Sequence, residues 1–398
     1  MSTPPLRITV TADLHFGNPR IDHVAMYDHL VHTLYPVIAT SHLFVCAGDT
    51  FDSLLSIATV PTMYAFRFFE DLIELSNTHG TQIRILHGTF SHDRKQILAF
   101  DSLLQGLKKH KDPTITDRIR IVTAMETEEI TTWRCDTEQF TRPLRVAYLP
   151  DSLPYKQGEE AVRALTAITE VVGWDTVDFL VGHGTFDFMM PKDVPLPPCT
   201  YTVDMFSSLV EGPIVMGHIH NHGSKKNVVY AGSFERMAHN EEGPKGFLVL
   251  TGDADGTWKT TFKQNKEATR FISIHPEGTE MDDIIKSYHQ QVTLRFPTGE
   301  GYVRVLHHDP EVRSTLSAIT ASQYPQLHYS AKTTGGEIPA LQLKTQAAYL
   351  REVNDAVIPT VDNLPTLVYE YIKNHATLHD YSHSLTQEHI TRICEQTE

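Results

Sequence analysis

The chain has 398 residues, of which 40% are hydrophobic and 21% charged, the proportions of an ordinary soluble globular protein. This length predicts two or three domains. The formal net charge of −15 argues against broad, charge-driven binding to nucleic acid, because proteins of that class carry a basic face. It does not exclude a nucleic-acid enzyme, since bound divalent ions can supply the positive charge.

Cysteine usage and the amino terminus both favour a cytoplasmic protein. The 4 cysteines lie far apart and form no CxxC pair, so neither a disulfide framework nor a zinc–thiolate site is expected. The amino terminus passes directly into a strand-like segment without the features of a signal peptide. No apolar run approaches the length of a membrane span, and no membrane contact is expected.

The first half of the chain alternates between apolar strands and amphipathic helices, and several strands end in polar residues. Strand-like segments cover residues 6–11, 42–47, 82–86, 145–149, 178–182 and 213–216. Helical patterns occupy residues 22–35, 59–76, 94–107 and 159–172. This rhythm predicts βαβ units that cover a sheet, an α/β fold.

The rhythm of strand and polar loop stops near residues 265–270, which predicts a domain boundary. Before it, residues 227–231, 246–251 and 258–263 alternate like antiparallel strands. The predicted domains are therefore 1–266, 267–331 and 332–398.

The two later domains differ in composition. Residues 271–331 predict a small α+β unit, with strands at 271–274 and 302–306 and helices at 281–288 and 311–322. Residues 332–337 have the composition of a linker. Amphipathic segments at 364–372 and 385–394 predict helices in the tail.

Polar residues with metal-binding chemistry follow the ends of the predicted strands. In chain order they are Asp13, His15, Asp49, Ser91, His92, His183, His218 and His220. The carboxyl ends of parallel strands meet at one edge of a sheet, so these side chains are expected to lie together. Carboxylate oxygens and imidazole nitrogens suit divalent ions such as Mn²⁺, Fe²⁺ or Zn²⁺. The set is larger than one ion needs, and Asp49 could bridge two.

Each of these features has a plainer explanation when taken alone. A Gly-Asp pair such as the one ending at Asp49 is most often a turn, and a single histidine such as His183 is usually a hydrogen-bonded core residue. His218 and His220 are harder to explain, because two imidazoles so placed after a strand are seldom needed for packing. The ordered set favours a two-metal centre, the usual device for in-line attack at phosphorus.

The order of these motifs resembles the calcineurin-like metallophosphoesterases, and within them the Mre11/SbcD nucleases, the partners of Rad50/SbcC-type ATPases. Two longer stretches, Gly48-Asp-Thr-Phe-Asp52 and Tyr230-Ala-Gly-Ser-Phe-Glu-Arg236, are similar to stretches of that family. Gly246-Phe247 is similar to its usual strand start. The resemblance covers residues 6–265 by motifs and the remainder by domain order.

The resemblance implies a four-layer αββα sandwich, a small capping domain that orients DNA, and a carboxy-terminal helical segment that binds the partner. A first metal ion would be held by Asp13, His15, Asp49 and His220. A second would be held by Asp49, His183, His218 and the residue at the family's Asn position. His92 would be the acid or phosphate-contacting histidine, oriented by Asp93, and Asp52 falls at a further catalytic position.

One motif departs from the family. The family's Gly-Asn-His-Asp is here Gly88-Thr-Phe-Ser-His-Asp93, two residues longer and with Ser91 where Asn is expected. A serine hydroxyl is a weaker ligand than an amide carbonyl. The second ion is therefore expected to bind less tightly or through water. The alternative is that His92 and Asp93 form only a polar turn before a helix.

The leading functional hypothesis is the one that the resemblance implies. It is an enzyme that uses two Mn²⁺ ions, with Fe²⁺, Zn²⁺ or Mg²⁺ as substitutes, to hydrolyse DNA phosphodiester bonds in repair and recombination. Family behaviour implies 3′→5′ exonuclease action on duplex ends and endonuclease action on single strands. It also implies a Rad50/SbcC-like ATPase partner and a homodimer, for which Phe66, Phe69 and Ile73 are candidate contacts. A phage-encoded relative acting in the host cytoplasm would suit the unusual metal motif.

Two other hypotheses remain open at this point. The first keeps the two-metal chemistry and changes the substrate, giving a metallophosphatase or a small phosphodiesterase. The second is a non-catalytic scaffold that keeps the fold and holds a partner. The residues 232–236 and the extra carboxy-terminal region favour the nuclease over a simple phosphatase.

Overall fold

The computed structural model describes residues 5–131, 143–151, 155–253 and 256–333. Contacts divide the chain into two units, Met1–Thr333 and Thr334–Glu398. The predicted carboxy-terminal helices at 364–372 and 385–394 lie outside the described residues. Among the described residues, no helix combines the length and the apolar character that a membrane crossing requires.

The first sheet has 6 strands in the order β12-β11-β1-β2-β3-β4. Its parallel part consists of β1 (Leu6–Thr11), β2 (Leu43–Ala47), β3 (Gln82–Leu86) and β4 (Ile119–Val122). Two antiparallel strands extend it, β11 (Gly246–Gly252) and β12 (Trp258–Gln264). Helices α1 (His23–His29), α2 (Tyr35–Ile38), α3 (Val60–His79), α5 (Leu98–His110) and α6 (Ile115–Arg118) connect these strands.

The second sheet also has 6 strands, in the order β5-β6-β7-β8-β10-β9. Strands β6 (Leu144–Leu149), β7 (Phe179–His183), β8 (Ile214–Gly217) and β10 (Val228–Tyr230) are parallel. The edge strands β5 (Glu126–Ile130) and β9 (Gly223–Lys225) run antiparallel to their neighbours. Helix α7 (Gly158–Val171) follows β6 in the chain.

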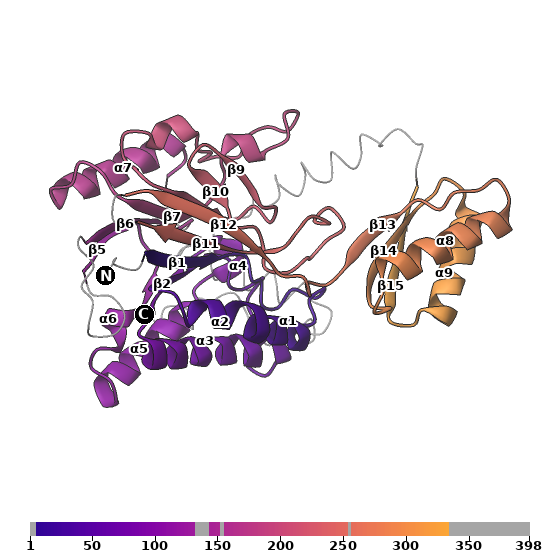
Figure 1. Ribbon diagram of the computed structural model, residues 1–398, viewed down its shortest axis with the longest axis horizontal. Helices are drawn as coiled ribbons and strands as arrows, with labels where there is room; N and C mark the ends of the chain where they lie inside the picture. The colour runs from indigo at the N-terminus through magenta and orange to yellow at the C-terminus, as the bar shows by residue number, and fades with distance from the viewer. Residues whose placement is uncertain (1–4, 132–142, 152–154, 254–255, 334–398) are drawn as a thin grey trace, which may run out of the picture. The chain divides into compact units, whose positions relative to one another are not determined.

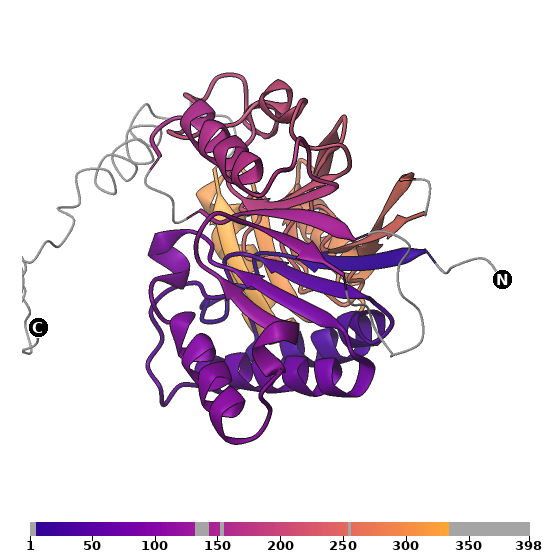
Figure 2. The ribbon, with the colours of Figure 1, turned by 90° about the vertical axis from the view of Figure 1, so that its left-hand side faces the viewer.

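Three buried apolar clusters hold these elements together. One lies between the first sheet and its helices and contains Phe68, Phe69 and Phe100. A second joins the inner faces of the two sheets, because it contains alternate residues of β1, β2, β6 and β7. A third lies between the second sheet and α7. Figure 2 shows α7 and the α1–α3 helices on opposite sides of the paired sheets.

Residues 271–332 form a separate 3-stranded sheet with its own core (Figure 1). Strands β13 (Phe271–Ile274), β14 (Gly301–Leu306) and β15 (Leu327–Lys332) are all parallel, and helices α8 (Met281–Arg295) and α9 (Pro310–Gln323) connect them. The sequence predicted the first two strands and both helices but not β15, whose burial is confined to Leu327 and, in part, Tyr329. The parallel pairing makes this region α/β rather than the expected α+β.

The mixed α/β class predicted from the sequence is confirmed, and so are most of the predicted elements. Helix α3 begins beside Pro61 and ends at Gly80, whose φ of 69° is the left-handed cap that glycine favours. The expected helix at 22–35 is interrupted by a π-helical segment, Leu30–Leu34. The strand predicted at 227–231 is present as β10, which pairs antiparallel with β9 as expected but also in parallel with β8. Strands β4 and β5 were not predicted.

Candidate metal centre

Six of the predicted ligands follow the carboxyl ends of β1, β2, β7 and β8, the central strands of the two sheets. They are Asp13, His15, Asp49, His183, His218 and His220. Asp13, His15, Asp49 and His218 have positive φ, between 49° and 92°. Such backbone is uncommon outside glycine and is concentrated at functional sites. The strands therefore end in tight turns, and these turns direct the side chains away from the strand axes.

The loops after β1 and β2 are held side by side by main-chain hydrogen bonds. Asp13 N donates to the Gly48 carbonyl at 3.1 Å and His15 N donates to the Asp49 carbonyl at 3.1 Å. Gly48 has a φ of 87°, and a Cβ there would lie 2.3 Å from His183 Nδ1. Only glycine therefore lets the two sheets approach closely enough to bring Asp49 and His183 together.

Asp13, His15 and His220 form the first group of donors, with one atom of each within 4.8 Å of the others. The Nε2 atoms of His15 and His220 are 3.1 Å apart. Both oxygens of Asp13 accept from His218 N, at 2.9 and 3.1 Å, which fixes the carboxylate. Asp13 and His15 are at most 1% exposed.

Asp49, His183 and His218 form the second group. Asp49 Oδ2 lies 3.3 Å from His183 Nε2 and 3.9 Å from His15 Nε2, so this one oxygen faces both groups. The Ala47 carbonyl lies 2.7 Å from His183 Nδ1 and can only accept a hydrogen bond, so Nδ1 carries the proton. The lone pair of Nε2 is then available to bind an ion.

Thr89 completes the second group. Its Oγ1 is 3.2 Å from Asp49 Oδ2 and 3.3 Å from both His183 Nε2 and His218 Nδ1. Ligand atoms bound about 2.0–2.2 Å from one ion lie roughly 2.8–3.6 Å from each other. The three distances from Thr89 and the 3.3 Å between Asp49 Oδ2 and His183 Nε2 fit a single coordination shell, and the chemistry of the donors fits a divalent ion.

The structure does not bring Ser91 to this group. Ser91 is exposed, and its carbonyl accepts from Arg94 Nε at 3.4 Å. The chain makes a helical turn, α4 (Phe90–Asp93), in which His92 N bonds to the Thr89 carbonyl at 2.9 Å. The donor next to the cluster is therefore the residue before the turn, Thr89. Counting back from the histidine, as in the family motif, selects the wrong hydroxyl.

Asp93 is placed differently from the expectation that it orients His92. Its carboxylate is fully buried and accepts from Phe51 N at 2.9 Å and from Gly88 N at 2.7 Å. These bonds join the loops that follow β2 and β3. Burial, and then the charge of Asp49, raise the pKa of Asp93 to about 6. His92 is instead held by the Asp52 carbonyl, 2.6 Å from its Nδ1.

The Asp52 side chain lies behind the first group rather than in it. Asp52 Oδ1 is 3.2 Å from His15 Nδ1 and accepts from Asn18 Nδ2 at 2.8 Å. His15, Asp52 and His92 also form a third set of donors within 4.8 Å. A carboxylate hydrogen-bonded to the far nitrogen of a ligating imidazole would fix its orientation, but His15 Nδ1 makes no hydrogen bond within the described part of the chain, so Asp52 acts on His15 through its charge.

Glu241 is hydrogen-bonded to His220 and fixes the orientation of that ring, and it was not predicted from the sequence. Glu241 Oε1 is 2.8 Å from His220 Nδ1, and Glu241 Oε2 accepts from the buried Lys245 ammonium at 2.9 Å. Although burial raises it, the hydrogen bonds and charges of His220 and Lys245 lower the pKa of Glu241 to about 2. The two residues are 21 positions apart, with strands β9 and β10 between them, so no local pattern marks the contact.

Electrostatics distinguish the centre from an ordinary core. Burial lowers the pKa of His183, but the Asp49 carboxylate outweighs this effect and raises that pKa to about 10. Burial likewise opposes ionisation of Asp49, but the charge of His183 holds the pKa of Asp49 well below its usual range. The centre therefore favours positive charge beside its carboxylates, which a divalent ion would supply.

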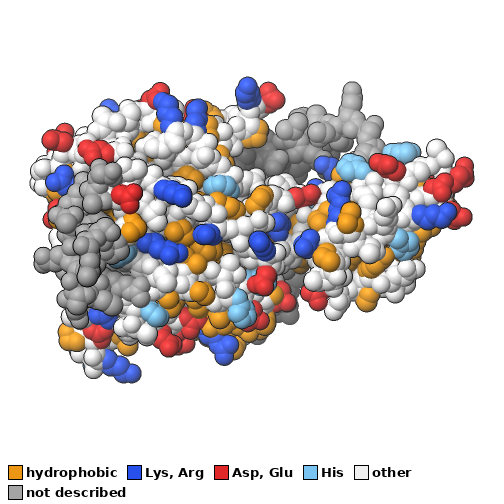
Figure 3. Space-filling view, viewed as in Figure 1, with side chains coloured by type: hydrophobic (Ala, Val, Ile, Leu, Met, Phe, Trp, Pro, Cys, Tyr) orange, Lys and Arg blue, Asp and Glu red, His pale blue; other side chains and the backbone are white. Residues whose placement is uncertain are grey.

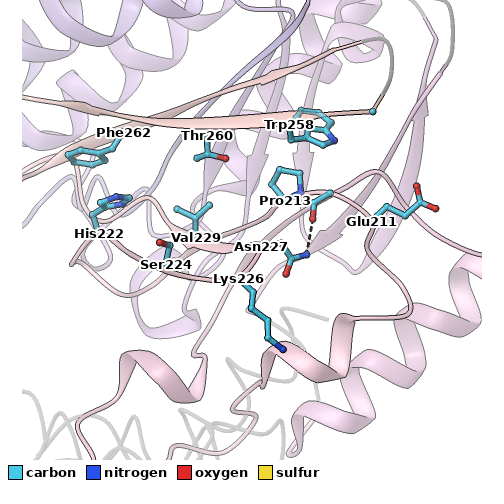
Figure 4. A pocket seen from close by; sticks show the side chains of 12 residues that line it. Glu211, Pro213, His222, Ser224, Lys226, Asn227, Val229, Trp258, Thr260 and Phe262 are labelled. Atoms are coloured by element: carbon cyan, nitrogen blue, oxygen red, sulfur yellow. Dashed lines mark hydrogen bonds between the residues drawn. The ribbon is translucent and has the colours of Figure 1, made fainter.

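A cavity of about 440 Å³ lies elsewhere, between the edge strands β9 and β12 (Figure 4). The His222 ring stacks on Phe262 with 4.2 Å between centroids, and Asn227 donates to the Gly212 carbonyl at 2.9 Å. Trp258 lines the opposite end (Figure 4). None of the candidate ligands lines this cavity, so it is separate from the metal centre.

No family model matches the chain, and a comparison with curated proteins finds no match. Among solved structures, one match is described as GAP50, the anchor in the inner membrane complex of Plasmodium. It has 13% sequence identity and a TM-score of 0.37, and it covers 72% of this chain and 95% of that chain. A likeness at this level carries no argument about fold or function.

Proposed function

We propose that this chain is a metal-dependent phosphodiesterase, and more narrowly a DNA nuclease of the Mre11/SbcD kind that uses two Mn²⁺ ions. The observation that carries the proposal is the position of Asp49 Oδ2, 3.3 Å from His183 Nε2 and 3.9 Å from His15 Nε2. One carboxylate that faces two groups of donors fits a bridged pair of ions. Such a pair lowers the pKa of a bound water, orients a phosphate and offsets the charge that develops at phosphorus.

The chain's own residues would divide the remaining work. Asp13 and His220 hold the first side of the centre, and Glu241 keeps His220 Nε2 directed toward it. His92 Nδ1 donates a hydrogen bond to the Asp52 carbonyl, so only the Nε2 proton of the doubly protonated ring is available to a leaving oxygen. His92 is half-buried, so it can reach both the centre and a substrate.

The choice of DNA as substrate rests on the sequence resemblance and on the distribution of charge. Although the net charge is −15, basic side chains follow β12 and the segment after it (Figure 3). Those exposed there are Lys259, Lys263, Lys266 and Arg270. A basic row on the same domain as the metal centre, although Glu267 interrupts it, suits a polyanionic substrate.

The finer parts of the proposal follow from the same resemblance. They are the four-layer αββα sandwich, a capping role for residues 267–331, a cytoplasmic setting and an ATPase partner of the Rad50/SbcC kind. A homodimer is supported by exposed apolar residues on α3, namely Val60, Met63 and Phe66. Phe69 is fully buried and stacks on Phe100 at 4.1 Å, so it is not available as a dimer contact, whereas Ile73 is partly buried against the core and remains a candidate.

Cleavage of a labelled linear duplex in Mn²⁺ tests the proposal. The wild-type chain is compared with Asp49→Ala and His92→Ala, and Ser91→Ala serves as the matched control because Ser91 is exposed and outside the cluster. We expect degradation of duplex ends by the wild type and the control. We expect a loss of at least about 100-fold in both site variants.

Two other outcomes would redirect the proposal. Hydrolysis of bis-p-nitrophenyl phosphate without cleavage of DNA, alone or with an added ATPase partner, would favour the small phosphodiesterase or phosphatase. Cleavage of DNA that survives Asp49→Ala would contradict the role given to the centre.

A further inference from the structure

The turn that follows Thr89, a hydroxyl donor of the metal centre, carries an aromatic side chain that is exposed to solvent. Phe90 is 63% exposed, and among the described residues no ring contact involves it. It directly follows Thr89, whose hydroxyl touches Asp49, His183 and His218. A single exposed apolar side chain needs no explanation by itself. Its neighbours and the rigidity of its loop give this one a further meaning.

The loop that carries Phe90 is fixed on both sides. Thr89 N donates to Asp49 Oδ1 at 2.6 Å, and Gly88 N donates to the buried Asp93 carboxylate at 2.7 Å. At the other end, His87 Nε2 lies 2.6 Å from the Arg94 carbonyl. Phe90 therefore has a fixed backbone relative to the ion-binding donors, and little entropy is lost when a ligand meets its ring.

Two basic side chains directly follow the same turn. Arg94 and Lys95 are exposed, and the Arg94 guanidinium reaches back to the Ser91 carbonyl. An aromatic face with neighbouring cations is the combination by which proteins hold single-stranded nucleic acid, since bases stack on the ring and phosphates meet the charges. In a duplex the base faces are covered by their neighbours, so only an unpaired base can use such a ring.

We propose that Phe90 stacks on an unpaired base next to the phosphate that is held at the metal centre. The inference rests on the proposed function and narrows its substrate class to strands whose cleavage site is single-stranded or frayed. Phe90 and Ser91 are also the two residues by which this motif exceeds the family's, once Thr89 takes the Asn position. The added length thus supplies a specificity determinant.

The test is a double-mutant cycle on binding, measured by fluorescence anisotropy in Mn²⁺. All chains carry His92→Ala, so that the ligands remain while cleavage is impaired. The probes are a labelled thymidine strand and the same strand with one abasic site, moved along its length. Phe90→Ala is compared with Phe90→Trp, and Leu98→Ala is the control, because Leu98 is also exposed, at 41%.

We expect Phe90→Ala to weaken binding of the intact strand about tenfold, and Phe90→Trp and Leu98→Ala to leave it nearly unchanged. For one position of the abasic site, Phe90→Ala should cause no further loss. An equal loss for every abasic strand, or none for the intact strand, would overturn the inference and leave the nuclease proposal standing. A Phe90→Ala variant that changes only the sedimentation of the chain would also overturn the inference, because it would assign Phe90 to an interface between copies of the chain. A chain with Phe90 intact that binds no strand would overturn both.

Discussion

Two buried polar clusters lie between the same pair of sheets, and they differ in whether their charges are satisfied. In one, the Arg84 guanidinium on β3 makes two bonds to the Glu128 carboxylate on β5, at 2.8 and 2.6 Å. Arg84 also donates to the Ile83 and Arg118 carbonyls, and Tyr148 donates to Glu128 at 2.8 Å. In the other, carboxylates and imidazoles crowd together at the strand ends around Asp49, without a matching set of cations.

The difference separates structural from functional polarity. A buried ion pair that is fully hydrogen-bonded joins the sheets and needs nothing further. A buried group of acceptors that face one another destabilises the fold unless a cation completes it. The charges of the Arg84 cluster are therefore paired within the protein, and we call this cluster closed. The carboxylates of the metal centre are not paired in this way, so we call that cluster open, and its contribution to stability depends on an added ion. Each of the following experiments changes one side of this comparison.

The largest effect on stability is expected from removing the arginine of the Arg84 cluster. Arg84→Met removes both guanidinium bonds of the mostly buried Glu128 carboxylate and leaves it Arg120 Nη1, at 3.1 Å, as its remaining cation, which should lower the free energy of unfolding by about 3 kcal/mol. Denaturant unfolding should show this loss equally with and without Mn²⁺. The double variant Arg84→Met, Glu128→Leu should recover most of it. A double variant as unstable as the single one would show that the pairing is not what matters.

Removing the shared carboxylate of the open cluster should abolish stabilisation by metal. At a Mn²⁺ concentration of 100 times the dissociation constant, binding adds about 2.7 kcal/mol to the stability of the wild type. Asp49→Asn keeps an acceptor for Thr89 N but loses the charge between the two groups. We expect its melting temperature to be nearly independent of Mn²⁺. An unchanged shift on adding Mn²⁺ would contradict the assignment of Asp49.

A better ligand at the second group should increase the affinity of the centre for one of its two ions. Thr89→Asn replaces a hydroxyl by an amide carbonyl at the position next to Asp49, His183 and His218. We expect the weaker of two Mn²⁺ binding events in a calorimetric titration to tighten about tenfold, or roughly 1.4 kcal/mol. Ser91→Asn is the matched control and should change nothing. The reverse result would restore Ser91 as the ligand.

A smaller effect on stability is expected from the pair of His29 and Glu235, which carries opposite charges only when His29 is protonated. Burial lowers the pKa of His29, but its hydrogen bond to Glu235 at 2.6 Å outweighs this and raises that pKa. The pair's contribution is therefore full below the unfolded pKa of about 6.5 and is lost as the pH rises through the folded value. Compared with His29→Gln, the stability advantage of the wild type should shrink between about pH 6 and 8. The exposed His32→Gln should leave that dependence unchanged.

Much of this arrangement could be predicted from the sequence. Apolar runs located the central strands, and polar residues at their carboxyl ends located Asp13, His15, Asp49 and the later histidines. The prediction worked because strand period and the edge rule of parallel sheets are local and strong. Strands β4 and β5 escaped it because they are short and carry charged residues, including the buried Glu128 pair, that obscure their alternation.

The parts of the centre that could not be predicted depend on turns and distant contacts. Thr89 rather than Ser91 joins the ligands because α4 is a single helical turn, which motif counting cannot reveal. Asp93 bonds to Phe51 N across 42 residues, and Glu241 bonds to His220 across 21 residues that include β9 and β10. Side chains that orient other side chains leave no periodic signal, so only the structure identifies them.

The most direct test of the open cluster is the number of Mn²⁺ ions that the full chain binds, measured by calorimetry and metal analysis after dialysis. We predict two ions per wild-type chain, the second weaker than the first, and the loss of both high-affinity events in Asp49→Ala. A chain that binds no Mn²⁺, or that binds equally well after Asp49→Ala, would contradict the account. The carboxylates and imidazoles would then be a buried polar cluster without a metal function.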